Sequence, residues 1–472
     1  MTIIIESPYT RANERGYILN VVLGEFLGLN WQRLPANRHD MRITMNGHPG
    51  EIRMPDVFLS MPDGKWLSFD SLPTQPLKFW DSNALGLPVA LIDKKLPVIY
   101  GAPDFLSAGQ PVNLNPESST FYLPIDIFGS AFFMLTRYEE VVKQDRDEHE
   151  RFPAWASLPF QEGFLLRPIV DEYTELLWAV MKRLWPGLER RTHEYKLVLT
   201  HDVDRPFGVK GEPFKNVVRR FGGDLIRRKS PGMAARRMAS LLLPGPHGDR
   251  LDPNNTFDWI MDQSEKNGLQ SEFYFMAGRT SNYDSGYDVF SPRIQRLLSR
   301  IHERGHIIGL HPSYGTLRRP DLLITEAENL RRAMDAAGAN QELHNGRQHY
   351  LRWHAERTWS DWEKAGLKQD SSVGFAQHVG FRAGTCRSYP AWSWPGGEPL
   401  RIRECPLIAM EGSLFSQNYM GLGAGKSLFV WKGLLQAVDN VGGLFMVLWH
   451  NDSLNSPIDA QVYQIIITGT LP

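Results

Sequence analysis

An apolar run that ends in three titratable side chains constrains this chain more than any other stretch. Residues 196–200 read Lys-Leu-Val-Leu-Thr, and His201, Asp202 and Asp204 follow within four positions. The run has the length and apolar character of a buried strand in a parallel sheet. Two carboxylates two positions apart repel each other unless a cation or a shared proton lies between them. The pattern predicts that Asp204 holds a metal ion and Asp202 acts as a base beside it. The alternative is a solvated strand end at which Asp202 caps the next helix.

From residue 195 onward, candidate strands and helices alternate along the chain. Strands are expected at 197–200, 273–276, 306–310, 349–353, 368–371, 400–405 and 444–449, with helices at 292–304, 321–337, 358–365 and 426–438. Alternation at this spacing is typical of parallel β/α architecture. In a parallel β/α barrel, the reactive side chains lie at the carboxyl ends of the strands.

The first part of the chain has a different pattern. Short strands separated by Asn-Gly and Asp-Gly turn signals are expected at 43–45, 51–54 and 66–69. Helices are expected after Asp126, which suits a helix cap, and over 169–184. The Pro186-Gly187 pair and the charged run after it mark a boundary. We therefore predict a smaller α+β domain at 1–190 and a β/α domain at 191–472.

Aspartate, histidine and arginine recur where the later strands are expected to end. Arg352 and His354 lie in and after the strand at 349–353, while His311, Asp370 and His450 stand at the ends of three other strands. A random set of strand ends would not be this rich in such side chains. Their joint occurrence indicates one catalytic site at that edge of the sheet.

Three of these motifs carry a resemblance to a known family. They are Thr200-His201-Asp202-Val203-Asp204, Gly305-His306-Ile-Ile-Gly309-Leu310-His311 and Val447-Leu448-Trp449-His450. In this order they resemble the polysaccharide deacetylases of the NodB-homology, carbohydrate esterase 4 type, over about residues 195–455. The resemblance implies an α/β fold, a distorted (β/α)7 barrel. The stretch from Ile125 to Glu140 resembles the uncharacterised N-terminal domain that accompanies bacterial deacetylase-like proteins of the Thr-His-Asp-Val-Asp subtype.

The resemblance also implies roles for individual residues. Asp202 would be the general base and His450 the general acid. Arg352 would orient the base, with Arg382 as a competing candidate for that role, and Asp370 would pair with the acid. The metal ligands implied are Asp204 and His311.

The chain departs from the family at one ligand. The family has a second metal histidine four residues after the first, and this position is Gly315. His349 is our candidate for the missing imidazole. Its alternative is a histidine satisfied locally at the start of a strand. The loop at 283–288 is a second possible source, through an oxygen ligand.

The function implied is metal-dependent removal of an N-acetyl or O-acetyl group. The substrate would be a glycan or a lipid-linked sugar precursor in bacterial surface-polysaccharide biosynthesis, and the cofactor a divalent metal, Zn²⁺ in the first place. One alternative is a barrel that lost its metal and only binds glycans, as Gly315 would suggest. Another is a metal-dependent amidohydrolase on a non-sugar substrate, although Trp353, Trp392 and Trp394 favour a sugar. A serine hydrolase is disfavoured because no Gly-x-Ser-x-Gly elbow occurs.

Composition and charge limit the kinds of partner that we expect the protein to bind. The formal net charge of −1 gives no attraction to nucleic acid. The start of the chain has no basic, then apolar, leader pattern and no apolar run reaches 18 residues, so we expect a cytoplasmic protein. Residues 210–240 carry nine Lys or Arg against Glu212 and Asp224, with apolar residues at helical spacing. This pattern predicts peripheral contact with an anionic membrane, or else a solvated helix packed on the barrel.

Overall fold

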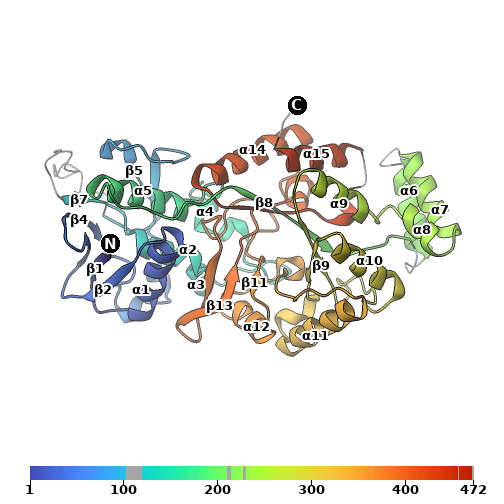
Figure 1. Cartoon of the computed structure of the whole chain (residues 1–472), viewed down its shortest axis with the longest axis horizontal. Helices are drawn as coiled ribbons and strands as arrows, with labels where there is room; N and C mark the ends of the chain where they lie inside the picture. The colour runs from blue at the N-terminus through green and yellow to red at the C-terminus, as the bar shows by residue number, and fades with distance from the viewer. Residues whose placement is uncertain (103–119, 210–213, 227–229, 455–456, 470–472) are drawn as a thin grey trace.

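The computed structural model describes residues 1–102, 120–209, 214–226, 230–454 and 457–469. The chain is a mixed α/β protein spread along one axis (Figure 1). A sheet formed by strands within residues 3–122 lies at one end, and a parallel sheet occupies the middle. The helices α6 (Phe214–Ile226), α7 (Pro231–Leu242) and α8 (Gly245–Leu251) lie together at the other end.

The N-terminal segment is built on a five-stranded sheet with the order β2-β1-β3-β4-β7. Its strands are β1 (Ile3–Ser7), β2 (Trp31–Pro35), β3 (Asp40–Met45), β4 (His48–Pro55) and β7 (Thr120–Tyr122), and β5 (Lys78–Asp81) pairs with β6 (Lys95–Val98) apart from it. Its helices are α1 (Ala12–Leu19), continued by a π-helical stretch, α2 (Ile127–Leu135), α3 (Tyr138–Val142), α4 (Leu158–Gln161) and α5 (Ile169–Leu184). The Asp126 carboxylate accepts the N–H of Gly129 at 2.8 Å, which confirms the predicted cap of α2. The strand expected at 66–69 is wrong, because short 3-10 turns flank this stretch.

A parallel sheet with the order β10-β9-β8-β15-β14 forms the middle of the molecule. Its strands are β8 (Lys196–Val203), β9 (Ser271–Phe275), β10 (Ile307–Leu310), β14 (Ala409–Met410) and β15 (Leu444–Leu448). In β8 every side chain from Leu197 to Val203 is buried, as the apolar run predicts for a strand covered on both faces. Because β15 pairs with β8, the first and last strands of this part are neighbours, which places their carboxyl ends together.

A three-stranded sheet and a layer of helices complete the chain. This sheet has the order β11 (Gln369–Asp370), β13 (Glu398–Glu404), β12 (Tyr389–Ser393). The helices are α9 (Phe257–Lys266), α10 (Pro292–Glu303), α11 (Pro320–Ala336), α12 (Thr358–Lys364), α13 (Glu411–Phe415), α14 (Ala424–Val441) and α15 (Pro457–Thr468). The strand expected at 349–353 is wrong. This segment is a 3-10 turn, His349–Leu351, because Tyr350 and Leu351 adopt left-handed φ angles of 62° and 53° that no strand can contain.

Single backbone contacts extend the parallel sheet beyond its named strands. Leu310 of β10 forms a parallel bridge with Gly346, and the N–H of Ser371 donates to the Gly346 carbonyl at 3.1 Å. These contacts run from β10 toward β11, which pairs with β13. They follow the order that closure into a barrel requires, but the closed (β/α)7 barrel itself stays a prediction.

Buried carboxylates join the N-terminal segment to the rest of the chain. Glu140 of α3 accepts from the guanidinium of Arg382 at 2.9 and 2.5 Å, and Asp171 of α5 accepts the N–H of Cys386 at 2.9 Å. Since unpaired charges are costly to bury, these contacts hold the two parts in one arrangement. Cys386 and Cys405 are both free and buried, so they form no bridge. Within the described residues, no helix combines the length and the apolar character that a membrane crossing needs.

Candidate metal centre and active site

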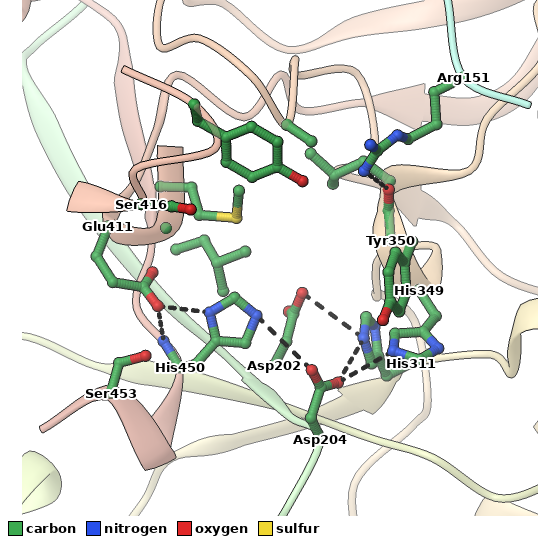
Figure 2. Close-up of a pocket in the computed structure, with 16 residues that line it drawn as sticks. Arg151, Asp202, Asp204, His311, His349, Tyr350, Glu411, Ser416, His450 and Ser453 are labelled. Atoms are coloured by element: carbon green, nitrogen blue, oxygen red, sulfur yellow. Dashed lines mark hydrogen bonds and ion pairs between the residues drawn. The ribbon is translucent and has the colours of Figure 1, made fainter. Parts of the chain in front are cut away.

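The carboxyl ends of three strands of the parallel sheet, β8, β10 and β15, meet at one pocket (Figure 2). Asp202 lies near the end of β8 with Asp204 just beyond it, His311 follows β10, and His450 follows β15. The open cavity there has a volume of about 320 Å³. The sequence motifs therefore converge in space at the edge of the sheet where parallel β/α proteins hold their active sites.

Asp204, His311 and His349 form a compact group within this pocket. Their candidate ligand atoms all lie within 4.8 Å of one another. Asp204 Oδ1 is 3.3 Å from His311 Nε2 and 3.5 Å from His349 Nε2. Both imidazoles are buried. The structure thus brings His349 to the other two predicted ligands.

The hydrogen bonds behind the two imidazoles fix which nitrogen faces Asp204. His311 Nδ1 lies 2.7 Å from the Arg347 carbonyl, which can only accept, so Nδ1 carries the proton. His349 Nδ1 lies 3.0 Å from Asp284 Oδ1. Burial raises the pKa of Asp284, but the His349 hydrogen bond and backbone N–H groups outweigh it, so the pKa is lowered and the carboxylate accepts. With Nδ1 carrying the proton, each ring in its neutral form turns an Nε2 lone pair toward Asp204, the arrangement found behind metal-binding histidines.

The donor set fits a divalent cation. Asp204 Oδ1 is buried and accepts no hydrogen bond, although two imidazole nitrogens surround it. Three electron-pair donors facing one another without a proton repel each other unless a cation lies between them. Two imidazoles and one carboxylate are a ligand set that suits Zn²⁺ and leaves positions open for water or substrate.

The position that lacks the family's second histidine is filled by packing. The Gly315 N–H donates to Thr280 Oγ1 at 2.6 Å. A Cβ at Gly315 would meet Thr280 Oγ1 at 2.7 Å and its Cβ at 2.8 Å. A histidine there would clash, so the imidazole comes from His349. The predicted loop at 283–288 supports this ligand through Asp284 and places no oxygen in the group of three.

The base candidate Asp202 is held by an arginine that the sequence analysis missed. Arg347 Nη1 donates to Asp202 Oδ1 at 2.9 Å, and both side chains are buried. The prediction that Arg352 or Arg382 orients Asp202 is wrong. Arg352 donates to the His149 carbonyl at 2.9 Å, and Arg382 binds Glu140. Neither arginine has a contact with Asp202 among the described interactions, because each is engaged by the N-terminal segment.

The acid candidate His450 is paired with Glu411. Glu411 Oε1 accepts from His450 Nδ1 at 2.6 Å, and the other ring nitrogen, Nε2, lies 3.9 Å from Asp204 Oδ2. Burial lowers the pKa of His450, but the Glu411 carboxylate outweighs it, so the pKa lies well above its ordinary value. His450 thus holds a proton that its Nε2 presents to the pocket. The expected pairing with Asp370 is corrected, because that carboxylate accepts from Ser372 instead.

Other residues singled out in the sequence have structural surroundings. His201 is fully buried, with Nδ1 2.7 Å from the Trp449 carbonyl and Nε2 3.2 Å from Ser271 Oγ, so it ties β8 to its neighbours. Trp353 and Trp392 are buried in the core away from the pocket. The aromatic side chains that do line the pocket are Tyr350 and Tyr419.

The missed residues had weak signals in the sequence. Arg347 lies two residues before His349, in a segment joined to the sheet by an isolated bridge. Glu411 follows β14, a strand of two residues that no periodicity could reveal. Its only signal was a carboxylate just before Gly412 in a stretch of apolar residues.

Comparison with known proteins gives limited matches. Residues 3–186 match a family of unknown function, DUF7033. No curated protein matches the chain. Similar solved structures include a "putative polysaccharide deacetylase" from Mycobacterium smegmatis, with 13% identity, a TM-score of 0.39, and coverage of 59% of this chain and 84% of that one. The PuuE allantoinase follows, with 11% identity, a TM-score of 0.36, and coverage of 60% and 85%. The carbohydrate deacetylase Agd3 has 9% identity, a TM-score of 0.31, and coverage of 64% and 54%. Similarities this low do not assign a function.

Proposed function

We propose that the protein is a metal-dependent hydrolase that removes an acetyl group from an N-acetylated or O-acetylated sugar, in a glycan or a glycan precursor of surface-polysaccharide biosynthesis. One observation carries the proposal. Asp202, fixed by Arg347, and His450, protonated beside Glu411, both adjoin the group formed by Asp204 and its two histidines, with Asp202 next to His311 and His450 next to Asp204 (Figure 2). A base and an acid beside one electrophilic centre are what the hydrolysis of an amide needs.

The residues divide the chemistry between them. A divalent cation held by Asp204, His311 and His349 would supply polarisation of the acyl carbonyl and a more acidic water. The Asp202 carboxylate takes a proton from the attacking water, and Arg347 orients that carboxylate. His450 Nε2 gives its proton to the departing amine nitrogen, because an amide cannot expel an unprotonated amine. The products are free acetate and a sugar amine.

A barrel that only binds glycans is the weaker explanation. Such a protein has no use for a protonated His450 in the same pocket as a buried, arginine-paired Asp202. Gly315 suggested that the barrel had lost its metal, because it lacks an imidazole. His349 lies beside Asp204 and His311 and can supply that imidazole.

Hydrolysis of a non-sugar amide is the second candidate. Trp353 and Trp392, two of the tryptophans that favoured a sugar, lie in the core, and the pocket instead combines Tyr350 and Tyr419 with apolar side chains such as Met410 and Leu448. Tyrosines can stack on sugar rings, but this lining would also accept other acyl amides. Substrate screening separates the two candidates.

The test is metal content together with acetate release. We expect purified protein to bind about one Zn²⁺-like ion and to release acetate from N-acetylated oligosaccharides. Asp204→Ala should lose both, and Asp202→Asn should keep the ion while losing the activity. If neither wild type nor Asp204→Ala holds or rebinds an ion, the metal-dependent reaction is refuted. If the ion binds and only non-sugar amides are cleaved, the second candidate replaces the first.

A further inference from the structure

The helices α6 and α7 carry an unusual combination of side chains. We call them the projecting hairpin, because they stand at the end of the molecule opposite the N-terminal sheet (Figure 1). Large apolar side chains on and just after them are well exposed: Val218, Leu225, Ile226, Met238, Leu242 and Leu243. Ile226 and Leu242 are the most open, with 78% and 74% exposed. Exposed apolar groups gathered on one element mark an interaction surface.

The charge of the projecting hairpin is one-sided. The only acidic residue in residues 214–226 and 230–243 is Asp224, which is buried and binds Arg237 at 2.8 Å. Lys215, Arg219 and Arg236 are all exposed. An occupant of this surface must therefore offer negative charge and an apolar interior.

We propose that the projecting hairpin docks on an anionic lipid bilayer. Its apolar side chains would enter the headgroup region, and its cations would lie against lipid phosphates. Such docking would bring the pocket to a membrane at which lipid-linked glycan precursors are found, but it does not depend on the activity.

The test is sedimentation of the full chain with vesicles. We expect binding to vesicles of 70% phosphatidylcholine and 30% phosphatidylserine, loss of binding in high salt, and little binding to phosphatidylcholine alone. The double reversal Arg219→Glu, Arg236→Glu should weaken binding about tenfold or more. The double change Ile226→Ser, Leu242→Ser should weaken it through the apolar contribution.

Matched controls lie on other helices. Arg296→Glu with Lys432→Glu makes the same charge change at exposed positions, and Phe429→Ser removes an apolar side chain that is 79% exposed on α14. These controls should bind like wild type. The proposal is refuted if the hairpin variants and the controls bind equally, or if the hairpin changes abolish self-association of the chain and leave vesicle binding intact.

The loop Asp147–Arg151 belongs to the N-terminal segment, but its Arg151 reaches the pocket (Figure 2). Arg151 Nη1 donates to the Tyr350 carbonyl at 3.1 Å, and Asp147 holds Arg151 by its Nε at 2.8 Å. The His149 ring lies 4.6 Å from the Tyr350 ring. These contacts converge on the residue that follows His349.

The turn that carries His349 needs support from outside. Tyr350 and Leu351 are successive non-glycine residues in left-handed conformations, which persist only where surrounding contacts impose them. On the far side of the turn, Arg352 donates to the His149 carbonyl at 2.9 Å and to Glu150 Oε2 at 3.1 Å. The loop thus forms hydrogen bonds with the turn on both sides of its strained residues.

We infer that the loop Asp147–Arg151 positions His349 as a metal ligand, with Arg151 as the positioning residue. This inference rests on the proposed metal site and gives the N-terminal segment a part in it. Residues that orient a ligand from behind change metal affinity by about 10- to 100-fold when removed. Arg151→Ala should therefore weaken Zn²⁺ affinity within that range, as measured by competition with a chelating dye, and Arg151→Lys should restore part of it.

Arg167→Ala is the matched control. Arg167 also binds backbone carbonyls and a carboxylate of the N-terminal segment, away from the pocket. It should leave the Zn²⁺ affinity unchanged. If wild type binds Zn²⁺ and Arg151→Ala binds it equally well, or if Arg167→Ala loses as much, the positioning role is refuted and the proposed function stands. If wild type binds no ion, the proposed function itself fails.

Discussion

The pairing of Glu411 with His450 gives the sharpest prediction about the chemistry. Glu411→Gln removes one negative charge and keeps the shape of the side chain. Two unit charges about 4 Å apart interact by about 4 kcal/mol at an effective dielectric constant of about 20. The change should therefore lower the pKa of His450, because the Glu411 carboxylate is what holds this pKa above its ordinary value. The ring then holds its proton less firmly than in the native protein.

The assay compares two leaving groups on the same enzyme. An N-acetyl sugar needs a proton on its departing amine, whereas an activated aryl acetate expels a stable phenolate without one. General acid catalysis contributes about 10²- to 10⁴-fold. We expect Glu411→Gln to lower kcat for the amide by about 10²-fold or more and to change the aryl ester by only about threefold. Bound metal should stay the same, since Glu411 is not among the three ligands.

Asp370→Asn is the control for this experiment. Asp370 is the carboxylate that the family pattern assigned to His450, and burial raises its pKa to about 7, so an amide is a tolerable substitute. It should show no dependence on the leaving group. The reasoning is refuted if Glu411→Gln slows both substrates equally, or if Asp370→Asn reproduces the selective loss on the amide.

Three further predictions concern the framework of the site. Arg347→Gln leaves Asp202 buried without its partner, so the free energy of unfolding in urea should fall by about 3 to 5 kcal/mol, and adding Asp202→Asn should recover part of it. Glu140 is buried, which raises its pKa, but its two arginine partners outweigh burial and lower it. Its stabilising effect is present above the ordinary carboxyl pKa and lost as pH falls through the lower folded value. Glu140→Gln should therefore cost about 3 to 5 kcal/mol at pH 7, with a difference from wild type that shrinks below about pH 4; a constant difference would contradict this. Finally, Gly315→His should not restore Zn²⁺ binding to His349→Ala, because the side chain at 315 meets Thr280; restored binding would show that the family position is still usable.

The parts of the site that follow regular strands were predictable from the sequence. Asp202, Asp204 and His450 flank β8 and β15, whose buried apolar runs have a recognisable length and pattern. His311 follows β10 in the same way. Residue type and strand end together were enough to place these four side chains at one edge of the sheet.

The partners of these residues were not predictable by the same reasoning. Arg347 and Glu411 lie where the backbone makes an isolated bridge and a two-residue strand, so hydrophobic periodicity carries no information there. Chain order suggested Arg352 and Asp370 instead. Arg352 is engaged by the 147–151 loop, a contact between segments about 200 positions apart. Such pairings are set by tertiary packing, which a local pattern cannot report.

The proposed use of His349 as a metal ligand changes what the rest of the chain must do. A histidine four residues after His311 would be placed by one local turn. His349 instead comes from another segment, where Asp284 fixes its tautomer and the left-handed Tyr350 sets its direction. Asp284 in turn accepts the Tyr314 N–H at 2.8 Å, and the Tyr314 hydroxyl lies 3.1 Å from His149 of the N-terminal segment. The geometry of the third ligand is thus distributed over segments that meet only when the whole chain is folded. It follows that metal affinity should depend on the docking of the N-terminal segment, a coupling that a locally placed histidine would not create.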